Sequence, residues 1–114
     1  MLSERDLAEF KRGSLQMVAL FLLREGDKYG YQIAQDIKLR SKGKFPIAQS
    51  VLYVMLYRMV EKGYIAKKEE RGPKKPKVFY HLEPAGEEFL DDLLRAYAEM
   101  NEGVSNIIDG GQKE

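Results

Sequence analysis

The chain has 114 residues with 19 Lys or Arg, 18 Asp or Glu, one His and no Cys, and its formal net charge is +1. This length predicts one compact domain. The composition excludes a disulfide framework, a thiolate metal site and a catalytic or zinc-binding histidine cluster, so no cofactor is expected. No signal-peptide pattern opens the chain and no apolar run approaches the roughly 18 residues of a membrane span, so we expect a cytoplasmic protein.

The small total charge conceals a strong polarity along the chain. Residues 1–82 contain 17 Lys or Arg and 9 Asp or Glu, a net charge of +8, whereas residues 83–114 contain 2 and 9, a net charge of −7. A basic body is typical of a protein that meets a polyanion. For the acidic part, the alternative is a helix whose carboxylates are simply solvated.

The first part of the chain predicts two helices. Leu7 and Phe10 suit a short amphipathic turn, and the apolar run Leu15–Leu23 suits a helix that is mostly core. Residues 25–28 interrupt this pattern, and a second amphipathic helix follows from about residue 31 to Arg40.

A third helix is expected to begin near Ile47 and to stop at Gly63. With the second helix and the short glycine-containing connection, it predicts a helix-turn-helix. Its apolar residues, which recur at three- and four-residue intervals and define one buried stripe, are Leu52, Met55, Leu56, Met59 and Val60.

Four side chains of the third helix are candidate DNA contacts. Gln49 and Ser50 lie at its start, where side chains can reach base edges or a phosphate, although Ser50 has helix capping as an alternative role. Tyr53 and Arg58 lie about one and a half turns apart, so each is expected to touch a different phosphate rather than to read a base. The alternative for Tyr53 is partial burial against the hairpin that follows.

Two strands are expected after this helix, one from Tyr64 and Ile65 and one over Val78–Leu82, joined by a turn rich in Lys and Pro. This hairpin predicts the wing of a winged helix, with a tip that enters or straddles the minor groove and gives salt-dependent binding. A solubilising loop is the alternative. The basic residues predicted to contact DNA are Arg71, Lys74, Lys75 and Lys77.

A last helix is expected over residues 84–108, followed by a flexible tail at 109–114. About 25 helical residues span about 37 Å, more than the DNA-binding domain at 1–83 needs for its own core. Part of the apolar stripe is therefore expected to meet a second copy, and the alternative is that it packs only on the Leu15–Leu23 helix. The residues predicted to form the dimer interface are Phe89, Leu93, Met100, Val104, Ile107 and Ile108.

These elements predict a mainly α fold with a small β-hairpin (α+β), arranged as a winged helix-turn-helix with a long C-terminal helix. The predicted function is sequence-specific binding of double-stranded DNA. The alternative is a winged-helix module that binds another protein. An enzyme is not expected, because the sequence has no nucleophile with a histidine base, no phosphate-binding glycine loop and no metal-ligand cluster.

Four separated blocks agree in order and spacing with one known family: Arg12–Leu15, Tyr29–Ile33, Ser50–Tyr53, and Phe79–Leu82 with Gly86. On these residues the chain resembles PadR-family transcriptional regulators, particularly the smaller LmrR-like branch. The resemblance implies a homodimer that binds a pseudo-palindromic operator and represses transcription until a small molecule releases it.

The resemblance also implies an effector site. Tyr97 falls where the smaller branch often carries a tryptophan that stacks on flat ligands, so a planar apolar effector is expected there, with core packing as the alternative. Tyr57 stands where the family often has arginine. The outer face of the third helix therefore differs, and an operator sequence does not carry over from other members.

Overall fold

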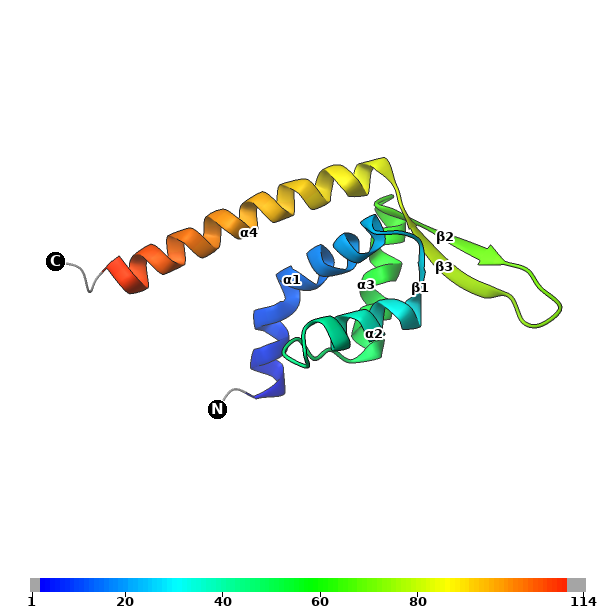
Figure 1. The fold of residues 1–114 in the computed structure, drawn as a ribbon, viewed down its shortest axis with the longest axis horizontal. Helices are drawn as coiled ribbons and strands as arrows, with labels where there is room; N and C mark the ends of the chain where they lie inside the picture. The colour runs from blue at the N-terminus through cyan, green and yellow to red at the C-terminus, as the bar shows by residue number, and fades with distance from the viewer. Residues whose placement is uncertain (1–2, 111–114) are drawn as a thin grey trace.

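The computed structural model describes residues 3–110, except for the side chains of Glu4 and residues 7–12. This part of the chain is mostly helical and confirms the predicted α+β class and winged helix-turn-helix (Figure 1). The elements are α1 (Glu4–Arg24), β1 (Lys28–Tyr29), α2 (Gly30–Arg40), α3 (Gln49–Glu61), β2 (Ile65–Glu70), β3 (Lys77–Leu82) and α4 (Pro84–Gly110).

α1 is one continuous helix, whereas the sequence predicted a separate turn at Leu7 and Phe10. A capping box starts the helix: the Ser3 hydroxyl accepts a hydrogen bond from the Asp6 N–H at 3.1 Å, and the Asp6 carboxylate accepts one from the Ser3 N–H at 3.3 Å. The prediction of a separate turn was wrong, because the box lies ahead of both residues and Gly13 does not interrupt the helix. The side chains of Leu7 and Phe10 lie outside the described residues.

The core lies between the three N-terminal helices, the sheet and the first half of α4. The stripe predicted for α3 is confirmed, since its central residues are fully buried and its two outer residues, Met55 and Val60, are partly buried. Each fully buried aliphatic side chain stabilises the fold by about 1.5–3 kcal/mol. Fully buried large side chains come from α1 (Leu20), α2 (Ile33), α3 (Leu52, Leu56, Met59), β2 (Ile65) and α4 (Leu90).

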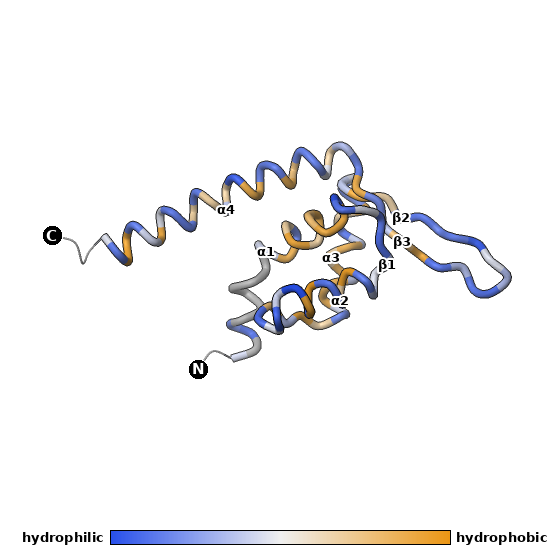
Figure 2. Tube along the Cα trace, in the orientation of Figure 1, coloured by the Kyte–Doolittle hydropathy of each residue, from blue (hydrophilic) through white to orange (hydrophobic). Residues whose placement is uncertain are grey.

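Within the described residues, the strands form one antiparallel sheet in the order β1-β3-β2. β2 and β3 pair along their whole length, and their outer part is the hydrophilic wing that extends away from the helices in Figure 2. β1 was not predicted. It consists of only Lys28 and Tyr29, which are strand residues because they pair with Tyr80 and Phe79 and not because they alternate in polarity.

α4 is 27 residues long, and its C-terminal half extends beyond α1 on the side of the molecule opposite the wing (Figure 1). The helix continues through Gly103 and includes Asp109 and Gly110, which the prediction assigned to the tail. The rest of that predicted tail lies outside the described residues. No helix in residues 3–110 is both long enough and apolar enough to cross a membrane.

The start of α4 is held against the start of β2. Gly86 lies so close to Tyr64 that an added Cβ would be 2.1 Å from the Tyr64 carbonyl oxygen. The same oxygen accepts a hydrogen bond from the Glu83 N–H at 3.0 Å, and the Tyr64 ring stacks on Phe89 with centroids 4.4 Å apart. These contacts set the direction in which α4 leaves the body.

Candidate nucleic-acid interface

The exposed start of α3 carries two of the predicted contacts, Gln49 and Ser50. Ala48 occupies the cap position and makes no capping hydrogen bond through its side chain. Ser50 is the second residue of the helix, so capping is not its role. Both side chains remain at the helix end, where they suit contact with base edges or a phosphate.

The outermost row of α3 contains residues that were not among the predicted contacts. Starting from Ser50, steps of four and three residues lead to Val54 and Tyr57, which are 51% and 63% exposed. Tyr53 and Arg58 flank this row on opposite sides, as expected for positions separated by one and a half turns. Apolar and aromatic side chains in this row suit contact with thymine methyl groups. This row could have been predicted from the sequence, because Val54 and Tyr57 follow Ser50 at helical spacing.

Tyr53 is exposed, and one side of its ring lies against α2. Its side chain is 41% exposed, and its ring lies on Gly30, the first residue of α2. The ring also lies near Tyr80 of β3. Burial is the main cause of the raised pKa of the Tyr80 phenol, and the nearby Tyr53 raises this pKa further. Tyr53 therefore connects α3 to both α2 and the base of the wing, while part of its ring stays accessible.

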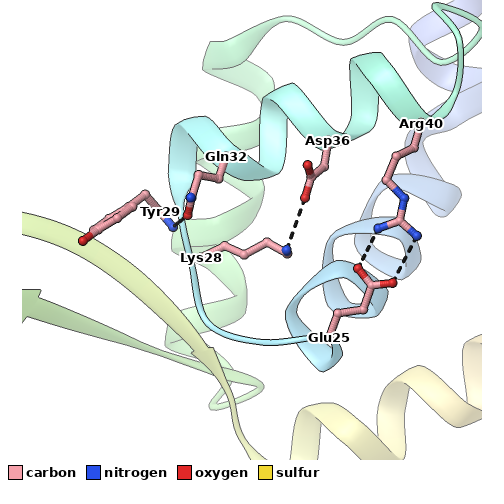
Figure 3. Close-up of polar contacts among 6 residues, drawn as sticks. All are labelled: Glu25, Lys28, Tyr29, Gln32, Asp36 and Arg40. Carbon is pink, nitrogen blue, oxygen red and sulfur yellow. Dashed lines mark hydrogen bonds and ion pairs between the residues drawn. The ribbon is translucent and has the colours of Figure 1, made fainter.

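Three polar contacts position α2 against the rest of the body (Figure 3). The hydrogen bond from Arg40 is the main cause of the lowered pKa of the Glu25 carboxyl. Because two of the basic side chains near α2 are compensated in this way, attraction of a polyanion must depend on other cations. The contacts join Arg40 to Glu25 at 2.6 and 3.1 Å, Lys28 to Asp36 at 3.2 Å, and the Tyr29 N–H to the Gln32 side-chain oxygen at 2.8 Å.

Those cations are concentrated on the wing. The four predicted residues at its tip, Arg71, Lys74, Lys75 and Lys77, are all exposed, and β2 adds exposed lysines that the prediction did not include. The wing also carries two glutamates, Glu69 and Glu70, directly before the tip. A polyanion that approaches the wing meets clustered positive charge with two carboxylates behind it. The additional lysines are Lys67 and Lys68.

A groove of about 310 Å³ separates the base of the wing from the helix-turn-helix. It brings together Tyr53, which was predicted from α3, and Lys77, which was predicted from the wing, although these residues are far apart in sequence. The other lining residues, which were not among the predicted DNA contacts, are Tyr29, Gly30, Tyr31, Val78 and Tyr80.

The residues predicted for the dimer interface divide into two groups. Phe89 and Leu93 pack against the core of their own chain. The other four continue beyond the body with Tyr97, which is 43% exposed, and form an exposed apolar stripe along one side of α4. We call this set the α4 stripe: Tyr97, Met100, Val104, Ile107 and Ile108.

His81 is a strand residue, as expected from the sequence. Its Nδ1 lies 2.7 Å from Asp27, in the loop between α1 and β1. Among the residues that the structure describes, no group of three or more His, Cys, Asp or Glu side chains is arranged to hold a metal ion.

The sequence model described as "Transcriptional regulator PadR-like family" matches residues 19–92, from α1 through the sheet to the first part of α4. The chain belongs to this family. It is therefore a PadR-family transcriptional regulator, and this family comprises regulators and not enzymes.

Related proteins agree with this assignment. A PadR-family regulator from Eggerthella lenta is 27% identical, with a TM-score of 0.77 over 88% of this chain and 86% of that one. Bacillus subtilis PadR in complex with operator DNA is 30% identical, with a TM-score of 0.65 over 70% of this chain and 46% of that one. An uncharacterized protein X from Lysinibacillus sphaericus is 30% identical over 103 residues, 87% of this chain and 92% of that protein.

Proposed function

We propose that this PadR-family regulator represses transcription by binding operator DNA as a homodimer. The observation that carries the proposal is the groove lined by both Tyr53 of α3 and Lys77 of the wing, because the third helix and the basic hairpin then border one contiguous surface. α3 would enter the major groove, and the wing would contact phosphates or the adjacent minor groove. The crystallised complex of Bacillus subtilis PadR with operator DNA supports this assignment.

The α4 stripe supports dimer formation. Ile107 and Ile108 are 79% and 61% exposed in the single chain, and contiguous exposed apolar surface of this kind is typical of an interface with another chain. A second copy would cover the stripe and give the assembly two-fold symmetry. The operator is then expected to contain two related half-sites separated by about one helical turn, or a multiple of it.

A small-molecule effector would act at this interface. Tyr97 belongs to the α4 stripe, and an aromatic side chain can stack on a planar apolar compound. A compound held between Tyr97 and its counterpart in the second copy would change the spacing of the two α3 helices. DNA affinity would then fall because the half-site spacing is fixed by the duplex.

The test is fluorescence anisotropy with labelled DNA from the promoter next to the gene of this protein and with a scrambled duplex, each at two salt concentrations. We expect tight binding to the promoter that weakens steeply with salt. Lys75→Ala should lower the affinity and the salt slope. Lys62→Ala is the matched control, because it also removes one exposed lysine but at the end of α3 opposite to Gln49. It should change the affinity and the salt slope less than Lys75→Ala does. If neither duplex binds at low salt, the winged helix is a protein-interaction module and the proposal is wrong.

A further inference from the structure

Tyr29 lies on the face of the sheet that also carries Phe79, Glu70 and Lys77, because β1 pairs Tyr29 with Phe79 and β2 pairs Glu70 with Lys77. The Tyr29 hydroxyl donates a hydrogen bond of 2.6 Å to the Glu70 carboxylate. Its ring meets Phe79 edge-on with centroids 6.3 Å apart, and the Lys77 ammonium lies 5.7 Å from its ring centroid. One side chain thus contacts both strands of the wing.

The same residue is also fixed to the helix-turn-helix. Its N–H donates a hydrogen bond to the Gln32 side chain in the first turn of α2 (Figure 3). Its ring stacks on Tyr31 with an interplanar angle of 4°. The following residue is Gly30, on which the ring of Tyr53 lies. A continuous series of contacts therefore runs from the wing through Tyr29 to α2 and α3.

Glu70 is an unexpected residue for a surface that meets a polyanion, because its carboxylate opposes the attraction of the neighbouring lysines. Its hydrogen bond with Tyr29 gives it a role. The bond to Glu70 is also the main cause of the raised pKa of the Tyr29 phenol. The bond joins residues 41 positions apart and links β1 to the last residue of β2, at the tip end of that strand.

We propose that the hydrogen bond between Tyr29 and Glu70 braces the wing at a fixed angle to α3, so that the wing lysines and α3 reach the same DNA duplex together. Tyr29 is thus a positioning residue for DNA binding, and it acts through the wing. This inference rests on the proposed function. A braced wing binds more tightly because less conformational freedom is lost when it docks.

Tyr29→Phe removes the hydroxyl and keeps the ring contacts. We expect DNA affinity to fall about three- to tenfold, the range given by one lost hydrogen bond, with the unfolding temperature little changed. Glu70→Gln and Glu70→Ala remove the same charge, but only Gln can still accept the hydrogen bond. The brace predicts weaker binding by Glu70→Ala than by Glu70→Gln. Equal affinities of these two variants would show that Glu70 acts by charge alone and would overturn the proposal.

A direct contact of Tyr29 with DNA would also weaken binding of Tyr29→Phe, and a double-mutant cycle separates the two causes. If the brace acts through the wing, Tyr29→Phe should lower DNA affinity little further in a protein that already carries Lys74→Ala and Lys75→Ala. An undiminished effect in that background would contradict it.

Amide hydrogen exchange and ¹⁵N relaxation of residues 71–76 in the free protein test the brace without DNA. Tyr29→Phe should increase both the exchange and the motion of this segment. Unchanged values would overturn the brace even if DNA binding is confirmed. Conversely, suppose that Tyr29→Phe loosens the wing of a protein that binds no DNA duplex. That pair of results would refute the proposed function but would support the brace as a structural contact.

Discussion

The ring of Tyr53 lies directly on Gly30, so closely that a Cβ added to this glycine would be 2.5 Å from Cε1 and 2.8 Å from the hydroxyl of the tyrosine. The requirement for glycine at the start of α2 is one of space. Any larger residue has to displace the Tyr53 ring, and that ring connects the helix proposed to bind DNA with α2 and the wing.

Gly30→Ala is expected to weaken DNA binding and to lower the free energy of unfolding by about 1–2 kcal/mol, the usual effect of overpacking a site that can partly relax. The loss is moderate because the Tyr53 ring is partly exposed and can move outward. In a Tyr53→Ala background, Gly30→Ala should lower the free energy of unfolding only slightly. Thermal unfolding of the two single variants and the double variant measures this coupling, and additive losses would argue against the contact.

Two glycines of α4 should respond to alanine in opposite directions. Gly86→Ala should destabilise the fold by about 1–3 kcal/mol, because its Cβ would collide with the backbone oxygen of Tyr64, which cannot rotate away as a side chain does. Gly103→Ala should stabilise by about 0.5–1 kcal/mol, because the space around Gly103 is open and alanine favours the helix. Denaturant unfolding of both variants provides the comparison, and similar effects would contradict the close packing at Gly86.

Ile107→Glu is expected to convert the proposed dimer into a monomer, because it places a charge in the apolar α4 stripe. Asn106→Glu introduces the same charge on the opposite side of α4 and is expected to leave the dimer intact. Sedimentation velocity at matched concentrations distinguishes the two. A wild-type protein that sediments as a monomer, or a dimer that is indifferent to Ile107→Glu, would rule out the stripe as the interface.

The pair formed by Glu25 and Arg40 should make stability depend on acidic pH. The Arg40 hydrogen bond is the main cause that holds the pKa of Glu25 below its ordinary value of 4.5. The pair therefore stabilises the fold above that value and loses its contribution as the pH falls through the lowered pKa. Arg40→Ala should lower the unfolding temperature near neutral pH, and the difference from wild type should shrink in strong acid.

Glu25→Gln provides the control for this pair, because an amide does not ionise. The difference in unfolding temperature between Glu25→Gln and wild type should shrink over the same acidic range as the difference for Arg40→Ala. A deficit of Arg40→Ala that stays constant from neutral to strongly acidic pH would assign the effect to lost packing of the arginine and not to the ion pair.

Tyr97→Ala should weaken binding of planar aromatic compounds if this residue is the proposed effector platform. Titration of a fluorescent aromatic dye against wild type and variant measures the effect, and the loss of stacking should lower the affinity by about three- to tenfold. Tyr57→Ala, which removes another exposed tyrosine, from α3, is the control. If Tyr97→Ala and wild type bind the dye equally well, the effector site lies elsewhere.

Local patterns in the amino-acid sequence were enough to predict the four main helices, the hairpin and the face of α3 that packs on the core. Leu52, Leu56 and Met59 recur with the period of a helix, and the lysine- and proline-rich turn between β2 and β3 cannot continue either strand. Such patterns are local, so they can be recognised without knowing what lies opposite them. They also predicted the acidic C-terminal helix, but they did not show which of its apolar residues pack against the core of the same chain.

Contacts between residues far apart in the sequence could not be predicted from those patterns. β1 exists because Tyr29 pairs with Phe79, and the brace joins Tyr29 to Glu70, 41 residues away. The structure also assigned Phe89 to its own core by stacking it on Tyr64, and left Met100 and the residues beyond it exposed. The physical reason is that periodicity specifies which face of an element is apolar. The partner that covers that face depends on how distant elements pack, and no local pattern records this.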